Sequence, residues 1–121
     1  MATLETAARN AAADALAALA DGGTLVLETS GDAEVSTHAF AGTAFGAASG
    51  GVATAAAIGD DTSAAGGTIA QASIYTSGAA KVMELTASAT GGGGEVQVSS
   101  LTITAGETVS ISSLTITVPA S

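Results

Sequence analysis

Residues 96–104 read VQVSSLTIT, and thirteen residues later residues 109–117 repeat this motif as VSISSLTIT. Apolar and polar residues alternate in both copies, as they do in half-buried β-strands. The alternation slips by one residue at the two Ser-Ser pairs, Ser99-Ser100 and Ser112-Ser113. A slip of one residue turns every later side chain to the other face of a sheet. Each copy is therefore predicted to contain a β-bulge or to bend onto a second sheet at its Ser-Ser pair.

The apolar residues on both sides of each slip are predicted to be buried. They are Val96, Val98, Leu101, Ile103, Val109, Ile111, Leu114 and Ile116. Between the two copies, residues 105–107 (Ala-Gly-Glu) contain the glycine that is typical of a turn. The repeat thus predicts two consecutive strand regions whose side chains belong to the core.

The same period of two runs through most of the chain after residue 23. Strands are predicted at 24–28, 33–40, 51–58, 68–76 and 81–89, separated by turns that include the glycine run 91–94. Several short strands with glycine turns and no alternating helices indicate a mainly β fold. We expect an antiparallel β-sandwich, jelly-roll-like, or an open barrel, formed by residues 24–118 within a single domain of 1–121.

One N-terminal helix is predicted in front of the strands, over about residues 4–20. Thr3 can cap it, and Glu5 lies in the first turn near the positive end of the helix dipole. Gly22 is predicted to end it in a left-handed conformation. Apolar residues recur at helical spacing on one face: Leu4, Ala8, Ala11, Ala15 and Leu19, widened by Leu16. Because this face has no basic or aromatic residue, we expect it to pack against protein rather than to bind a membrane.

The composition predicts a small core. Of the 121 residues, 30 are alanine and only 24 are Leu, Ile, Val or Phe. Burial of a large aliphatic side chain contributes roughly 1.5–3 kcal/mol, and burial of alanine far less. Ordering the backbone costs roughly 1–2 kcal/mol per residue. We therefore expect the chain to gain much of its stability from an assembly.

The charge balance excludes several classes of partner. Eleven acidic residues face two basic ones, Arg9 and Lys81, for a formal net charge of −9. We expect no nucleic-acid binding, which needs a basic patch, and no binding to anionic membranes. The chain has no cysteine for a disulfide or a thiolate zinc site. With no signal-peptide pattern and no run of 18 strongly apolar residues, we expect a protein that is cytoplasmic until it is assembled.

Residues with catalytic or ligand chemistry are few. His38 is the only histidine, and no cysteine or carboxylate accompanies it, which favours a surface or strand residue over a base or metal ligand. Asp60 and Asp61 could bind calcium, but the further spaced carboxylates of a calcium loop are missing, so turn residues are the simpler interpretation. The glycine run 91–94 lacks the lysine of a phosphate loop. We expect no enzymatic activity, no catalytic, cofactor-binding or metal-binding residues, and no cofactor.

Three segments resemble a widespread family of small proteins encoded among the structural genes of tailed bacteriophages and prophages. The first joins Ala8-Arg9-Asn10 to the turn 21–23 and the strand LVL at 25–27. The second is AFGAA at 44–48 with GVATA at 51–55, and the third, the most specific, is ITAGETVSISSLTITVP at 103–119. Two features depart from the family. This chain has Glu-Thr-Ser at 28–30 in place of the usual Tyr-Thr-Gly, and a less aromatic strand at 69–75.

The resemblance implies a structural protein of the virion. The first hypothesis is a capsid decoration or cement protein that binds the major capsid protein on the outer shell and ties neighbouring capsomers together. As a cement protein it is expected to be a homo-oligomer, with a trimer favoured. The second hypothesis is a tail or head–tail component, such as a minor tail or fibre-associated protein with a receptor-binding role. Phe40, Phe45 and Tyr75 are too few for an aromatic recognition surface, which favours the capsid.

Overall fold

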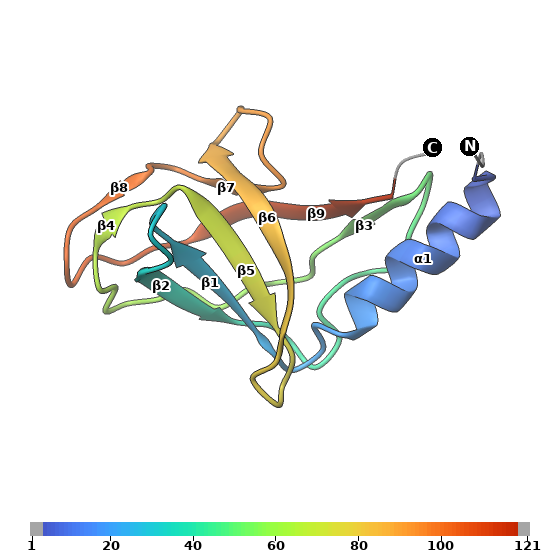
Figure 1. Cartoon of the computed structure of the whole chain (residues 1–121), viewed down its shortest axis with the longest axis horizontal. Helices are drawn as coiled ribbons and strands as arrows, with labels where there is room; N and C mark the ends of the chain where they lie inside the picture. The colour runs from blue at the N-terminus through green and yellow to red at the C-terminus, as the bar shows by residue number, and fades with distance from the viewer. Residues whose placement is uncertain (1–3, 119–121) are drawn as a thin grey trace.

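A computed structural model describes residues 4–118 of the chain, which form one helix followed by nine strands (Figure 1). The helix α1 spans Thr6–Ala18. The strands are β1 (Thr24–Glu28), β2 (Glu34–Ala39), β3 (Val52–Thr54), β4 (Gly67–Thr68), β5 (Gln71–Tyr75), β6 (Lys81–Ala89), β7 (Val96–Val98), β8 (Thr102–Ile103) and β9 (Ile111–Thr117). The predicted fold class is confirmed, since the protein is mainly β and carries one N-terminal helix beside a half-closed barrel.

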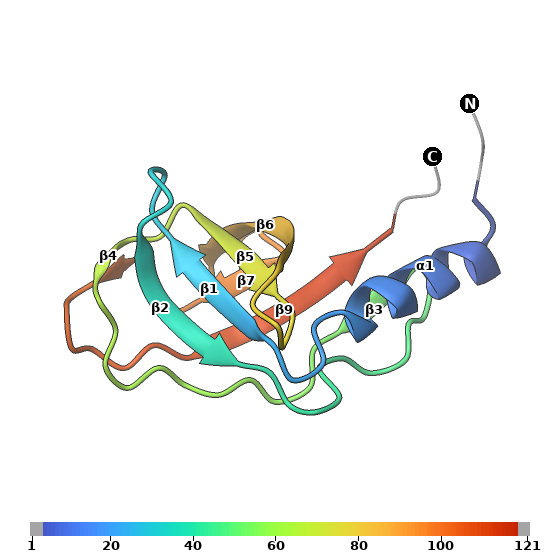
Figure 2. The same cartoon turned by 60° about the horizontal axis from the view of Figure 1, so that its bottom comes forward.

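The barrel is one curled sheet. Seven strands follow the order β2-β1-β5-β6-β7-β9-β3, and β4 pairs with β8 in a separate two-stranded sheet. Figure 2 shows the segment that follows β3 running alongside β2. In that segment the backbone N–H groups of Gly59 and Gly66 donate to the carbonyls of Ala39 (3.0 Å) and Val35 (3.2 Å) of β2. These bonds cover the outer edge of β2, which would otherwise present unpaired backbone groups.

One strand pair is parallel, so the sheet is mixed rather than purely antiparallel. β7 runs in the direction of β6, with Ala87 opposite Val96. Parallel neighbours ordinarily need a connection of a dozen or more residues. Here residues 90–95 suffice, because the glycine run folds back tightly against β6. A Cβ on Gly94 would lie 2.7 Å from the backbone nitrogen of Ser88, a distance that only glycine avoids.

The slip in the apolar–polar alternation is accommodated by a bend onto a second sheet at one Ser-Ser pair and by a β-bulge at the other, which are the two predicted ways. Ser99-Ser100 lies between β7 and β8, where the chain passes from the seven-stranded sheet to the two-stranded one. Ser112 is a bulge in β9, because Gln97 pairs with Ser113 while the next residue of β7 pairs with Ile111. The second copy stays in one sheet because β7 pairs with the first half of β9 and β3 with the second half.

The core lies inside the curl of the sheet and includes the apolar residues of the repeat. Among them, Val96, Val98, Ile103, Val109, Leu114 and Ile116 are buried, whereas Leu101 and Ile111 are half-buried. They belong to one cluster with the buried leucines and isoleucine of the opposite wall, Leu25, Leu27, Ile74 and Leu85. The predicted core positions are therefore confirmed, six fully and two in part.

The predicted strand at 68–76 is wrong in its continuity, because it is divided between β4 and β5. At Ile69 the backbone N–H donates to the carbonyl of Leu101 (2.7 Å), beside the small sheet. At Ala70 the backbone N–H donates to the carbonyl of Glu28 (2.8 Å), at the end of β1 in the large sheet. The chain therefore crosses between the two sheets at these residues.

The other predicted strands agree with the structure to different degrees. Those at 24–28 and 81–89 coincide with β1 and β6, and the one at 33–40 contains β2. The one at 51–58 is regular only over β3. Beyond β3 the chain makes isolated bridges, from Ala55 to Phe45 and from Ile58 to Phe40, because it leaves β9 to reach the end of β2.

α1 is two residues shorter than predicted at each end. Its N-cap is Glu5, in an extended conformation (φ −71°, ψ 161°) and without a side-chain cap. The predicted cap, Thr3, lies outside the described residues. Turns follow Ala18, and Gly22 has the predicted left-handed conformation (φ 68°).

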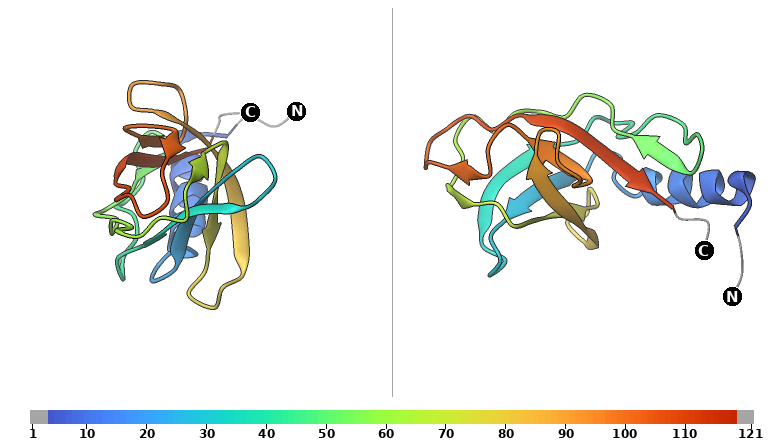
Figure 3. Two further views of the ribbon diagram at one scale, coloured as in Figure 1. Left: turned by 90° about the vertical axis from the view of Figure 1, so that its left-hand side faces the viewer. Right: turned by 90° about the horizontal axis from the view of Figure 1, so that it is seen from above.

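α1 lies outside the barrel. It packs on β3 and on the second half of β9, and together these elements form an extension at one end of the long axis (Figure 3). The barrel occupies the other end. Among the residues that the structure describes, no helix has the length and apolar character needed to cross a bilayer.

Candidate interaction surface

Three polar side chains of α1, those of Arg9, Asn10 and Asp14, form hydrogen bonds with the loop 43–51. Asn10 accepts a hydrogen bond from the backbone N–H of Gly51 (2.8 Å), and Asp14 accepts one from Ala48 (2.8 Å). Arg9 donates from Nη1 to the carbonyl of Gly50 at 3.4 Å. Just past the helix, Asp21 accepts a hydrogen bond from the N–H of Ala44 (2.8 Å). These side chains thus bind backbone groups of the loop in addition to the backbone hydrogen bonds that the loop makes with neighbouring segments.

The outer face of α1, defined here as Ala8, Ala11 and Ala15 of the helix with the flanking Leu4 and Leu19, is exposed at every position. Leu4 and Leu19 are 38% and 47% exposed and are the large hydrophobic residues most open to solvent among those described. The sequence predicts this face, widened by Leu16, to pack. Leu16 is half-buried and packs against the core, whereas the other five positions are exposed, so the prediction holds for Leu16 alone. Alanines on the opposite side, Ala13, Ala17 and Ala20, are buried instead.

The composition of α1 explains why the predicted face is largely exposed and the opposite face is buried. Alanine occurs on all sides of α1, so the apolar pattern does not distinguish one face from another. The inward face is decided by the loop 43–51, whose backbone N–H groups need the acceptors of Asn10 and Asp14. The small side chains beside these acceptors then allow α1 to lie close to β3 and β9. A soluble helix ordinarily exposes mainly polar residues, whereas the exposed residues of α1 are mostly alanine, with Thr6 and Asp14 among them.

A shallow hollow of about 120 Å³ lies between α1 and this loop, lined by Asp14, Ala17, Ala18, Asp21, Thr43, Phe45, Gly46 and Ala47. Small-molecule sites usually measure about 300–1,000 Å³. Its two carboxylates are already bonded to backbone N–H groups of the loop. The hollow is therefore a seam of the helix–loop contact rather than a ligand pocket.

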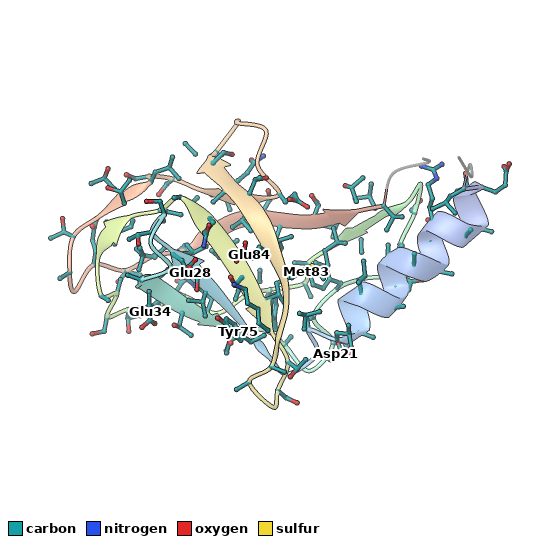
Figure 4. The ribbon with its side chains drawn as sticks, viewed as in Figure 1. Asp21, Glu28, Glu34, Tyr75, Met83 and Glu84 are labelled. Carbon is teal, nitrogen blue, oxygen red and sulfur yellow. The ribbon has the colours of Figure 1, made fainter. Side chains whose placement is uncertain are left out.

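Acidic residues concentrate on the barrel. Eight of the eleven belong to it: Glu28, Asp32, Glu34, Asp60, Asp61, Glu84, Glu95 and Glu107. Figure 4 shows Glu28, Glu34 and Glu84 on the barrel strands and Asp21 at the foot of α1. Lys81 pairs with Glu84 at 2.6 Å, an exposed ion pair of small energetic value. The extension consequently carries much less negative charge than the barrel.

Asp61 has a structural role that its sequence context only partly predicts. Its Oδ1 accepts a hydrogen bond from the N–H of Ser63 (2.9 Å), which confirms the interpretation as a turn residue. Its Oδ2 accepts one from Thr37 of β2 (2.9 Å), 24 residues away, and thereby caps the sheet edge. These two donors, Thr37 first and Ser63 second, lower the pKa of the Asp61 carboxyl below its ordinary value, assisted by the proximity of His38. The neighbouring Asp60 is exposed.

His38 lies in β2, as the sequence allows, but it is fully buried and has a partner that the sequence analysis missed. Its Nδ1 lies 2.8 Å from the carbonyl oxygen of Gly59, which can only accept, so Nδ1 carries a proton. The other ring nitrogen, Nε2, lies 2.9 Å from Ser36 Oγ, which is also fully buried. A signal for this pair is present in the sequence, because residues two apart in a strand share a face. Through the bond from His38 to Gly59, the pair holds β2 against the segment that follows β3. Both side chains are fully buried, so a substrate cannot reach them.

Glu28 is a second buried polar residue that sequence reasoning did not single out. It is 5% exposed at the end of β1, where its Oε1 accepts a hydrogen bond from the hydroxyl of Ser73 (2.7 Å). Gln71 Nε2 donates to the same oxygen at 3.4 Å. The partners come from β5, because β1 and β5 pair with Glu28 opposite Gln71. Only this long-range pairing brings the three together, so the local sequence could not indicate them.

The Ser-Ser pairs and the glycine run, which the sequence analysis also considered, shape the backbone. The Ser-Ser pairs form a bend and a bulge, and the glycine run forms the β6–β7 connection. Within residues 4–118, no three His, Cys, Asp or Glu side chains gather in a way that could hold a metal ion. The chain matches no family model, no curated protein and no solved structure. The feature with the clearest capacity for interaction is therefore the outer face of α1.

Proposed function

We propose that this protein is a non-enzymatic structural component of a tailed-bacteriophage particle, and that it decorates and cements the capsid shell. The observation that carries the proposal is the orientation of α1, which bonds Asn10 and Asp14 to the loop 43–51 and leaves the outer face exposed. An exposed apolar helix face is typical of a surface that another protein covers. The resemblance of three segments to a phage structural family supplies the setting.

In this proposal the partner is the major capsid protein, and the protein acts on the outer surface of the virion as a homo-oligomer, with a trimer favoured. The small core supports dependence on partners, since a third of the buried apolar residues are alanine. The buried positions of Ser36 and His38 support a non-enzymatic role, because no substrate could reach them.

The copy number of the chain in purified particles tests the proposal. Quantitative mass spectrometry against the major capsid protein is expected to give on the order of hundreds of copies per particle, as a component repeated with the shell requires. About six to a few dozen copies would replace the capsid location with the second hypothesis, a tail or head–tail component. Absence of the chain from purified particles would reject both locations.

A further inference from the structure

We infer that α1 is a detachable lid, which undocks from β3 and β9 as a unit while the barrel stays folded. The inference stands apart from the proposed function, because purified chain alone can test it. It begins from the position of α1 on the extension, outside the barrel (Figure 3). An element with few buried apolar contacts opens locally at a much smaller free-energy cost than global unfolding.

The apolar contact that holds α1 in place is made by small side chains. Within the helix Ala13 and Ala17 are buried and Leu16 is half-buried. The large side chains that are fully buried belong to strands of the barrel instead: Leu25, Leu27, Val35, His38, Ile74, Val96, Val98 and Leu114. Burial of an alanine stabilises a fold far less than burial of a leucine or an isoleucine. Undocking of α1 therefore removes little apolar contact and leaves the core of the barrel in place.

Hydrogen bonds supply much of the remaining attachment of α1. Asn10 and Asp14 each accept one bond, from the backbone N–H groups of Gly51 and Ala48. Water can replace both partners, so each bond adds only a modest net stabilisation. The helix also begins without a side-chain cap, and an isolated helix of 13 residues is marginal in water. Once undocked, α1 is expected to unravel and to expose its backbone N–H groups.

Gly22 is the residue at which α1 can turn away from the barrel. Its neighbour Gly23 is fixed, because a Cβ there would lie 2.0 Å from the carbonyl oxygen of Tyr75 in β5. The carbonyl of Gly23 also accepts a hydrogen bond from the N–H of Phe40 (3.0 Å). Gly22 has a left-handed conformation (φ 68°) and no side chain, so its backbone dihedral angles can change freely. A rotation at Gly22 moves α1 without moving β1.

Thiol labelling tests whether α1 undocks, because the chain has no native cysteine. Ala53 of β3 is fully buried opposite Ile116 of β9, in the two strands on which α1 packs. Ala53→Cys is expected to react with DTNB when α1 undocks. Ala72→Cys is the matched control, because Ala72 is also 0% exposed but lies in β5 of the barrel. We expect Ala53→Cys to react at least about a hundredfold faster than Ala72→Cys in the absence of urea.

Asn10→Ala distinguishes undocking of α1 from fraying of β3 alone. The substitution removes the bond to Gly51 and does not weaken the helix itself, since alanine is the best helix former. It is expected to speed labelling of Ala53→Cys by about three- to tenfold and to leave labelling of Ala72→Cys unchanged. Equal reaction rates of the two cysteine variants, or no acceleration by Asn10→Ala, would overturn the inference.

Hydrogen exchange of the wild-type chain makes the same comparison without a substitution in a strand. After correction for intrinsic rates, the amides of Ala13 and Ala17 are expected to exchange at least about a hundredfold faster than the amide of Ile74, which lies in β5 between two paired strands. Protection of the α1 amides equal to that of Ile74 would show that the helix opens only when the whole chain unfolds, and the lid would then be rejected.

Discussion

Leu114→Ala measures how much of the fold depends on the second copy of the repeat. Leu114 lies in the middle of β9, where it is 1% exposed, pairs with Val96 and accepts a hydrogen bond from the backbone N–H of Ala55 at its carbonyl. The backbone bonds survive the substitution, so the loss comes from the side chain. Removing a fully buried leucine side chain costs about 2–5 kcal/mol, through lost transfer free energy and the cavity that remains.

The assay is urea unfolding of dilute protein, followed by circular dichroism. A domain of this size is expected to unfold with a total free energy of roughly 6–18 kcal/mol and an m-value of about 1–3 kcal/mol/M, so the midpoint should fall by about 1–3 M. Leu19→Ala is the matched control: the same substitution at a side chain that is 47% exposed should cost less than about 1 kcal/mol. A loss below about 0.5 kcal/mol for Leu114→Ala, or a loss equal to that of Leu19→Ala, would refute the placement of the repeat in the core.

Three other substitutions test individual contacts of the fold. Asp61→Asn should cost about 1–2 kcal/mol at pH 7, because one amide oxygen replaces two carboxylate acceptors. Since folding lowers the pKa of Asp61 from its ordinary value of 3.8, its contribution is present above that value and is lost as the pH falls through the lower folded-state pKa, so the difference from wild type in urea unfolding should shrink as the pH falls below 3.8. Gly94→Ala should cost about 1–3 kcal/mol in the same assay, whereas Gly93→Ala, where a Cβ meets open space, should change stability by less than about 0.5 kcal/mol. Asn10→Ala should speed hydrogen exchange at the Gly51 amide several-fold through loss of a bond worth about 1 kcal/mol; unchanged exchange would show that this bond does not hold the loop.

For the repeat, the sequence predicts that each copy contains a bulge or a bend, but it does not predict which of the two each copy contains. The slipped alternation at each Ser-Ser pair requires a bulge or a bend on local geometry alone, and the structure contains one of each. Whether a copy of the repeat forms a bulge or a bend depends on neighbouring strands that lie far away in the sequence. β9 is held on both sides, by β7 and β3, so it can only bulge, whereas the chain after β7 is free to turn to β4.

The parallel β6–β7 pair and the buried polar residues lie beyond local prediction for a related reason. Period-two patterns identify strands but not their neighbours or directions. The glycine run 91–94 indicates a turn, yet only its tight contact with Ser88 makes a short parallel connection possible. Glu28 and Asp61 likewise acquire their partners from strands that pair with or lie beside their own. Their roles follow from topology, which the local sequence does not contain.

The weakest prediction from the sequence concerns which face of α1 is buried, and the same feature supports the proposed assembly. Its position could be predicted, because its spacing is helical and Gly22 follows it in a left-handed conformation, although the helix is two residues shorter than predicted at each end. Its buried face could not be predicted, because alanine occurs on all its sides. Alanine also fills a third of the core, which leaves the isolated chain with little apolar surface to hold it. The structure bonds Asn10 and Asp14 to the loop 43–51 and leaves Leu4 and Leu19 exposed. Under the proposed function, a capsid surface that covers α1 would remove these leucines from water and stabilise the chain.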